Sequence, residues 1–336
     1  MSSVSEAGFH VSPKEERKVI FASSLGTVFE WYDFYLFAVL AIFFTDKFYP
    51  PGNPTVALLA SLATLAAGFL VRPFGALVFG RLGDMIGRKY TFLVTILLMG
   101  ISTAALGFLP TYAQIGDAAW IILLLLRLMQ GLALGGEYGG AATYVAEHAP
   151  PGKRGLSTAW IQTTATLGLF LALIVIYLCR TSLAADDFKQ WGWRIPFWFS
   201  ILLLIFSVYI RLKLNESPLF QRMKEEGKGS KSPLTDSFLR YPNNKYVLLA
   251  LLGATAGQGV VWYTGQFQVL FFLQNALKVD FQITYILLAI ALVISTPFFI
   301  FFGWLSDKIG RKWIIMCGCL LGAVTYFPLF NALTQA

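Results

Sequence analysis

Five ionisable residues interrupt long apolar segments of this 336-residue sequence. Glu30 and Asp33 lie in the first segment, Arg72 in the second, and Arg127 and Glu137 in the fourth. A charged side chain in an apolar surrounding costs several kcal/mol, so each of the five predicts a function. Carboxyl groups in such a place can take up and release protons, and arginines can bind anions.

The spacing of the charged residues predicts that they share helix faces. Glu30 and Asp33 are three residues apart, so both would point to the interior of a helical bundle. Arg127, Gln130 and Glu137 fall on one stripe of the fourth segment. We expect this stripe to line a cavity that binds a solute.

Depth along antiparallel helices predicts which charges meet. Asp33 matches Arg127 in depth, and Arg72 matches Glu137, so we expect these two ion pairs. Glu30 is then left without an obvious cation, and we interpret Glu30 or Asp33 as the proton carrier. A solute would compete with a carboxylate for Arg127. The alternative is that the pairs are permanent and only hold helices together.

Uncharged polar residues extend the candidate solute site. Tyr138 follows Glu137, Gln162 lies in the fifth segment, and Gln258, Trp262 and Gln266 recur every four residues in the seventh. The last three would form a polar stripe on the opposing half of the molecule. Amides can bind a polar solute without net charge, although a glutamine in a membrane helix also serves as an interhelical hydrogen bond.

The segments that would position these residues read as membrane helices. Hydrophobic residues make up 57% of the chain and charged residues 13%, against about 25% in soluble domains. A span needs about 20 apolar residues. The sequence predicts nine spans, at residues 19–44, 55–80, 90–110, 118–148, 156–180, 194–214, 246–275, 283–305 and 313–334.

Basic residues predict how the spans are oriented. Nineteen Lys and Arg fall in the loops on one side of the predicted membrane and five on the other, which places the N-terminus in the cytoplasm. We divide the chain into a cytoplasmic tail (1–18), an N-terminal six-span bundle (19–214), a cytoplasmic linker (215–245) and a partial C-terminal bundle of three spans (246–336). The net charge of +8 is explained by this distribution, so we expect no nucleic-acid partner.

A short basic turn occurs twice, as GRLGDMIGRKY from Gly80 and as GWLSDKIGRKW from Gly303, with seven of eleven positions identical. The offset of 223 residues indicates a duplicated half-molecule, because solenoid repeats are much shorter. Asp84 and Asp307 could meet the N-terminus of a neighbouring helix, and Glu147 is the expected partner of Arg88. The alternative is that the turns act only as orientation signals.

The two turns resemble the loop signature of major facilitator superfamily transporters. The Phe-Glu-Trp-Tyr-Asp-Phe run at 29–34, together with Arg-x-x-Gln-Gly and Gly-Gly-Glu-Tyr-Gly-Gly in the fourth segment, resembles the metabolite:proton symporter branch, which takes dicarboxylates, osmolytes and shikimate. The run Asn-Glu-Ser-Pro-Leu-Phe from Asn215 resembles a box found between the halves of these proteins. The gating role that the resemblance implies falls on Gly80, Asp84, Gly87, Arg88, Glu147, Asp307 and Arg311.

The resemblance implies an all-α polytopic membrane protein of the major facilitator fold, with a six-helix N-terminal bundle, an incomplete C-terminal bundle and about nine of twelve spans. It implies secondary transport by alternating access in the cell (inner) membrane, most simply proton symport of a carboxylate or dicarboxylate by a monomer. A proline or betaine symporter and an inactive, truncated remnant are the alternatives. We expect no enzymatic activity, cofactor or metal site, since no nucleotide-binding loop or metal-ligand spacing occurs.

Overall fold

The computed structural model describes residues 13–52, 54–227, 232–279 and 281–335, and every regular element in them is helical. The chain divides into two compact units, Met1–Pro150 with Ile161–Lys231 and Pro151–Trp160 with Ser232–Ala336. Most of the predicted tail, 1–18, lies outside the described residues, and from Pro13 onward the chain is helical.

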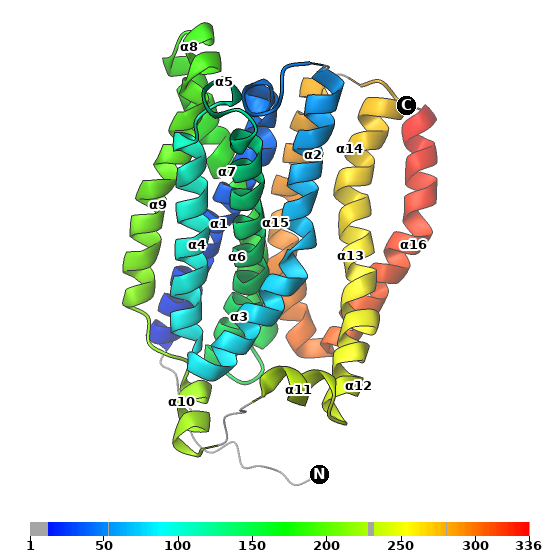
Figure 1. Ribbon diagram of the computed structural model, residues 1–336. Coiled ribbons are helices and arrows are strands. Elements are labelled where there is room, and N and C mark those ends of the chain that lie inside the picture. Colours follow the sequence, from blue (N-terminus) through cyan, green and yellow to red (C-terminus); the bar gives the residue numbers. More distant parts are fainter. Residues whose placement is uncertain (1–12, 53, 228–231, 280, 336) are drawn as a thin grey trace. The chain divides into compact units, whose positions relative to one another are not determined.

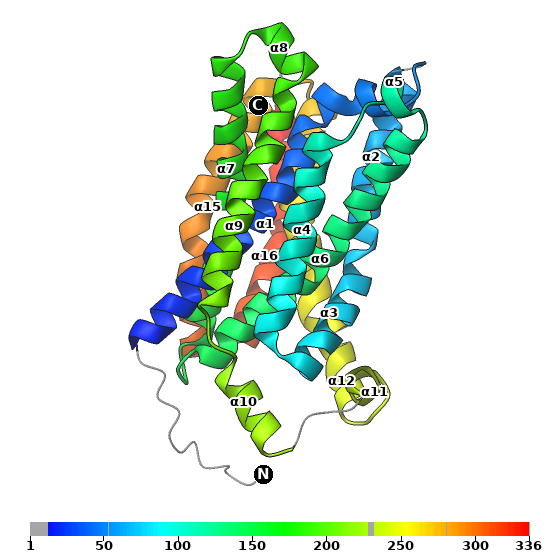
Figure 2. The same ribbon diagram turned by 60° about the vertical axis from the view of Figure 1, so that its left-hand side comes forward.

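The first unit is a bundle of long helices (Figure 1). Its elements are α1 (Pro13–Phe48), α2 (Pro54–Leu70), α3 (Arg72–Ile86), α4 (Arg88–Phe108), the short α5 (Tyr112–Ile115), α6 (Ala118–His148), most of α7 (Arg154–Ser182), α8 (Ala185–Gln190), the 3-10 turn η1 (Gly192–Arg194), α9 (Ile195–Leu212) and α10 (Pro218–Glu225). Both α1 and α4 pack against α6 and α9, as Figures 1 and 2 show. The four helices therefore enclose the side chains that α1 and α6 turn inward.

Apolar side chains hold α1 in the bundle. Tyr32, Leu36, Phe37 and Leu40 are fully buried and belong to one core cluster. The Tyr32 hydroxyl donates to the carbonyl oxygen of Pro196 at 2.8 Å, so its polar end is satisfied where α9 begins. These contacts fix the rotation of α1 and with it the direction of Glu30 and Asp33.

The second predicted span is two helices rather than one. α2 ends at Leu70 and α3 begins at Arg72, with a turn at Val71. Pro73 explains the interruption, because proline lacks an amide hydrogen and its ring displaces the carbonyl four residues earlier. Arg72 consequently lies at the bend between α2 and α3.

Glycines of α6 allow very close packing on α2 and α3. A Cβ atom added at Gly131 would lie 2.1 Å from the Gly68 carbonyl oxygen, and one at Gly135 would lie 2.1 Å from that of Arg72. Any larger residue at these positions would push the helices apart. The glycine pattern of α6 therefore serves helix contact, as in other small-residue interfaces of membrane helices.

The second unit begins with α11 (Pro233–Phe238) and contains three long helical stretches. The first runs from α12 (Asn243–Leu248) through η2 (Leu249–Thr255), α13 (Ala256–Tyr263), η3 (Thr264–Gln268) and α14 (Val269–Phe271) to η4 (Phe272–Ala276), with π-helical geometry in the three η segments. α15 (Phe281–Ile309) and α16 (Arg311–Gln335) are the other two. The seventh predicted span is thus a helix of alternating pitch, so residues four apart do not keep one face along its length.

Both copies of the repeated turn join two helices through a single glycine. Gly87 separates α3 from α4 with φ of 114°, and Gly310 separates α15 from α16 with φ of 92°. Residues with a Cβ atom rarely adopt positive φ, so the turn requires glycine at this point. The repeat in the sequence is therefore a repeat of backbone structure.

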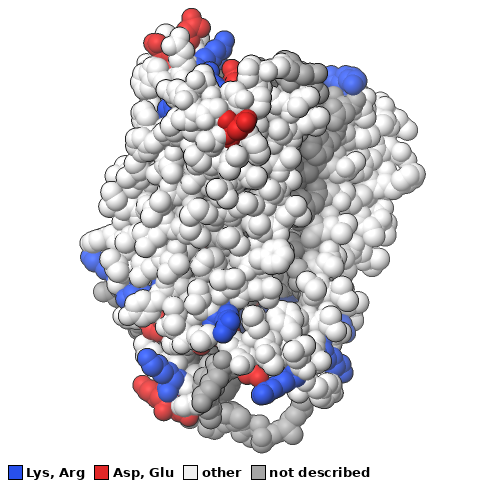
Figure 3. Space-filling model, in the orientation of Figure 1, with Lys and Arg blue, Asp and Glu red and all other residues white. Residues whose placement is uncertain are grey.

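Eight helical stretches of the described residues are long and apolar enough to cross a membrane. Together with α1, which has 36 residues including Glu30 and Asp33, they match the nine predicted spans. The face drawn in Figure 3 has a broad band without charged side chains between two charged ends. Such a band is what a lipid-facing surface requires.

Candidate functional site

Three buried ionisable residues from three helices meet inside the first unit. Arg211 of α9 forms an ion pair with Glu137 of α6, and both side chains are 1% exposed or less. The Thr95 hydroxyl of α4 donates to the other oxygen of Glu137 at 2.6 Å. On α1, a Cβ atom added at Gly26 would lie 2.7 Å from Arg211 Nη2, so this glycine makes room for the guanidinium.

Glu30 of α1 is the third member of this cluster. It is 3% exposed, and the charged groups that act on it are Glu137, Arg211 and Asp33. Neither carboxyl oxygen of Glu30 accepts a hydrogen bond from a residue that the structure describes. Two carboxyl groups therefore share one guanidinium, and the cluster is electrically neutral only when it holds one proton.

The predicted ion pair Arg72/Glu137 is wrong, because Glu137 pairs with Arg211. Glu30 forms no ion pair with a cation among the described residues, as predicted, although the charge of Arg211 acts on it. The Arg72 guanidinium carbon instead lies 4.3 Å from the Phe34 ring centre and 4.1 Å from that of Phe69. The prediction rested on matched depths, and depth does not give the direction in which a side chain leaves its helix. The bend at Val71 changes that direction for Arg72.

Arg211 was missed although the predicted sixth span, 194–214, includes it, because it was counted among the basic residues on the cytoplasmic side. It is nevertheless inside α9, which continues to Leu212. One signal was available in the sequence. Ser200, Ser207 and Arg211 are spaced by seven and four residues on an otherwise apolar helix, and all three are buried. A polar stripe of this kind indicates a face turned toward other polar groups.

The predicted ion pair Asp33/Arg127 is also wrong. Asp33 accepts a hydrogen bond of 2.5 Å from the Ser200 hydroxyl. Arg127 Nη1 donates to Gln130 Oε1 at 2.8 Å and to the Phe34 carbonyl oxygen at 3.5 Å. Asp33 and Arg127 thus have separate partners, although both are buried.

The uncharged candidates are only partly brought together. Tyr138 and Gln162 interact through their side chains within the first unit. In the second unit Gln258 is exposed, and Trp262 packs on Phe299 with ring centres 5.7 Å apart. The side chain of Gln266 lies outside the described part of the structure.

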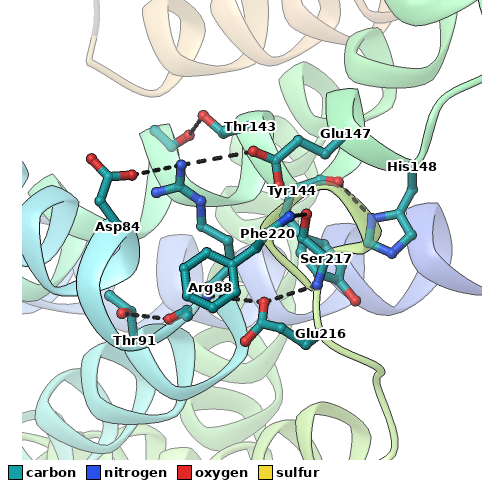
Figure 4. Close-up of polar contacts among 12 residues, drawn as sticks. Asp84, Arg88, Thr91, Thr143, Tyr144, Glu147, His148, Glu216, Ser217 and Phe220 are labelled. Carbon is teal, nitrogen blue, oxygen red and sulfur yellow. Dashed lines mark hydrogen bonds and ion pairs between the residues drawn. The ribbon is translucent and has the colours of Figure 1, made fainter. Parts of the chain in front are cut away.

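A second polar cluster surrounds the turn at Gly87 (Figure 4). Arg88 Nη2 lies 2.9 Å from Asp84 and 3.7 Å from Glu147, which confirms the predicted contact between Arg88 and Glu147. Glu216, which the sequence placed at the start of the linker, accepts hydrogen bonds from the backbone amides of Arg88 at 3.0 Å and Lys89 at 3.2 Å. Glu216 therefore neutralises the N-terminus of α4, a role that the predictions did not include.

The second copy of the turn makes a related contact inside the second unit. Asp307 accepts hydrogen bonds from the backbone amides of Gly155 at 2.7 Å and Leu156 at 2.8 Å, in the first turn of α7. Arg311 lies 3.2 Å from the same carboxylate. The predicted contact of Asp307 with a helix N-terminus is confirmed, whereas Asp84 pairs with Arg88.

Comparison with known proteins shows the family. The model of the family described as "Sugar (and other) transporter" matches residues 18–243. The chain belongs to this family of transporters. It is 34% identical to the shikimate transporter of Escherichia coli K12 over 328 residues, which cover 96% of this chain and 74% of that protein. It is also 35% identical to the proline/betaine transporter of Salmonella typhimurium LT2, covering 94% of this chain and 64% of that protein.

The chain covers only part of the length of the proteins that it resembles. The inner membrane metabolite transport protein YhjE of Escherichia coli K12 is 47% identical over 218 residues, which are 65% of this chain and half of YhjE. Among solved structures, the proton:xylose symporter XylE, a major facilitator superfamily protein, superimposes with a TM-score of 0.67 at 17% identity, over 90% of this chain and 71% of XylE. The predicted major facilitator fold is therefore confirmed, for a chain that spans half to three quarters of the length of these relatives.

Proposed function

We propose that this transporter-family protein couples the movement of a small organic solute to the movement of protons, with Glu30 as the proton carrier. The observation that supports this most strongly is the buried cluster of Glu30, Glu137 and Arg211. Relatives named as transporters of shikimate and of proline or betaine, and the fold shared with a proton:xylose symporter, support solute transport.

The charges of the cluster explain why a proton would come and go at Glu30. Glu137 has a cation at one oxygen and a hydroxyl donor at the other, so both of its oxygens have partners. Glu30 has no hydrogen-bond donor among the described residues, yet Arg211 retains two nitrogens without an acceptor there, Nε and Nη1. A protonated Glu30 leaves the cluster neutral, and an ionised Glu30 would draw the guanidinium toward α1. Protonation is thereby linked to the contact between α1, α6 and α9.

A small void connects the two acids of α1. It has a volume of about 10 Å³ and is lined by Glu30, Asp33, Met99 and Ser207, among others. This volume is at the lower limit for one water molecule, and the polar groups around it suit one. A water molecule there would pass protons between Glu30 and Asp33, so Asp33 acts as the second group of the proton path.

The remaining predictions fit this function. Tyr138, Gln162, Gln258, Trp262 and Gln266 are candidate solute contacts. The polar clusters at the two repeated turns would hold the cytoplasmic ends of helices together in one state of an alternating-access cycle. The excess of Lys and Arg in one set of loops supports a cytoplasmic N-terminus in a bacterial inner membrane.

Proteoliposomes test the proton role. Glu30→Gln should abolish solute accumulation driven by a pH gradient, yet retain exchange of labelled for unlabelled solute at equal pH, because exchange needs no net proton release. A panel of shikimate, 2-oxoglutarate, proline and glycine betaine serves as the solutes. Glu225→Gln on the exposed surface of α10 is the matched control and should behave as the unaltered protein. Full gradient-driven accumulation by Glu30→Gln would rule out Glu30 as the carrier.

A further inference from the structure

Arg127 is fully buried, yet only one of its three guanidinium nitrogens is satisfied. Nη1 donates to Gln130 Oε1 and to the Phe34 carbonyl oxygen. Nε and Nη2 are buried and have no acceptor in the part of the chain that the structure describes. Buried donors without acceptors are rare in folded proteins, so this pair requires an explanation.

The two unsatisfied nitrogens form one edge of the guanidinium group. Nε–H and one N–H of Nη2 point in parallel from that edge, with the spacing of the two oxygens of a carboxylate. A carboxylate can therefore accept both in a bidentate contact, the strongest arrangement available to arginine. On the same side, Gly68 packs closely on Arg127, because a Cβ atom added there would lie only 3.1 Å from Nε, so a larger residue at this position would crowd this edge.

No residue that the structure describes supplies an anion to this edge. The ion pairs among the described residues do not include Arg127, and the charged group that acts on it is another cation, Arg72. Leaving a buried charge uncompensated costs several kcal/mol, which a structural role alone would not justify. The charge is thus available to a ligand, and the same cost favours binding of an anion.

Resting on the function proposed above, we propose that the Nε/Nη2 edge of Arg127 binds the carboxylate of the transported solute, and that this solute carries net negative charge. Gln130 is a positioning residue. Its amide oxygen holds Nη1, while its Nε2 donates to the Thr103 hydroxyl at 2.8 Å, so the guanidinium is fixed with its other edge open.

The aromatic rings near Arg127 favour an anion over a zwitterion. The ammonium group of a zwitterion would need a carboxylate or a ring face. The guanidinium carbons of Arg127 and Arg72 lie 4.1 and 4.3 Å from the centre of the Phe34 ring. Arg127 also lies over the Phe37 ring, and Arg72 over the Phe69 ring. These faces are occupied by cations, which would repel a third positive charge.

Binding of defined probes to the purified full-length protein tests the inference. Shikimate and 2-oxoglutarate are the anionic probes, methyl shikimate lacks the charge, and glycine betaine is the zwitterion. Calorimetric titration at constant pH should show binding of at least one anion and none of the ester. Arg127→Gln should weaken anion binding roughly a hundredfold, and Arg127→Lys, which keeps the charge without the fork, roughly tenfold. Arg240→Gln, on the exposed linker, should change nothing.

Thermal unfolding of the ligand-free variants separates this role from a structural one. Because Arg127 has no anionic partner among the described residues, Arg127→Gln should unfold at the same temperature as the unaltered protein or a higher one. A lower temperature with unchanged anion binding would overturn the proposal. So would anion binding that is insensitive to Arg127, equal binding of the ester, Arg127-dependent binding of betaine alone, or no binding of any probe.

The outcomes also distinguish this inference from the proposed symport. If a pH gradient drives solute accumulation but Arg127→Gln binds anions normally, only the carboxylate site is wrong. If Arg127→Gln loses anion binding but a pH gradient drives no accumulation by the unaltered protein, only the proton coupling is wrong.

Discussion

Removal of Arg211 should destabilise the protein far more than removal of Glu30, although both belong to one cluster. Arg211→Gln leaves Glu30 and Glu137 buried without a cation. Breaking a buried ion pair by removing one partner costs about 3 to 5 kcal/mol. Glu30→Gln removes an acid that accepts no hydrogen bond in the described structure, and it leaves the Arg211–Glu137 pair intact. Its effect should stay within about 1 kcal/mol.

Glu137→Gln should fall between these two variants. The guanidinium of Arg211 then loses its closest carboxylate but can turn to Glu30, which is already near it. The amide oxygen that replaces the carboxylate can still accept the Thr95 hydrogen bond. The expected order of destabilisation is Arg211→Gln, then Glu137→Gln, then Glu30→Gln.

Thermal unfolding of the purified protein in detergent measures this order. Arg211→Gln should lower the midpoint by roughly 10 °C, and the deficit should shrink at acidic pH, because protonation removes the uncompensated charges. The double variant Glu137→Gln/Arg211→Gln should be more stable than Arg211→Gln alone, since one stranded acid is gone. Equal unfolding midpoints for Arg211→Gln and Glu30→Gln would refute the argument that Arg211→Gln leaves buried carboxylates without a cation. A lowering of the Arg211→Gln midpoint that does not depend on pH would refute it as well.

Two further pairs of substitutions test the packing and the repeated turn. Gly131→Ala should destabilise the protein by about 1 to 3 kcal/mol, because its Cβ atom would meet the Gly68 carbonyl oxygen. Gly139→Ala should be neutral or stabilising, because the space around Gly139 is open. The unfolding midpoints of the two variants measure the difference. Asp307→Asn should cost about 1 kcal/mol, because it weakens the hydrogen bonds to two amides of α7. Asp84→Asn should cost less, because Asp84 pairs with Arg88 of its own turn, and a larger effect of Asp84→Asn on the unfolding midpoint would contradict this assignment.

The sequence was sufficient for the spans and for the repeated turn. Spans follow from the length of apolar runs, a one-dimensional property that the bilayer imposes on any helix. The turn was predictable because the backbone at Gly87 and Gly310 needs positive φ, so the same residue type recurs at the same point. The division of the helix at Val71 was not predicted, although Pro73 is a local signal for it.

The partners inside the bundle were not predictable from depth. Two residues at one depth meet only if their helices are neighbours and are rotated toward each other, and both conditions depend on packing of the whole unit. Glu137 illustrates this. Arg72 was expected at the same depth as Glu137, but it lies against Phe34 and Phe69, while Arg211 reaches Glu137 from the end of the sixth predicted span. Glu216 was overlooked for the same reason, since a capping carboxylate contacts a helix distant in sequence.

The structure shows why the acids of α1 should act together rather than singly. Asp33 is held by Ser200 and Glu30 faces Arg211, so both acids of α1 meet groups of α9. Ser200 and Arg211 are eleven residues apart on that rigid helix, which fixes their separation at about 16 Å along its axis. Any displacement of α9 along α1 therefore changes both contacts at once. A single helix movement would alter the proton affinity of both carboxyl groups, without a separate pathway linking them.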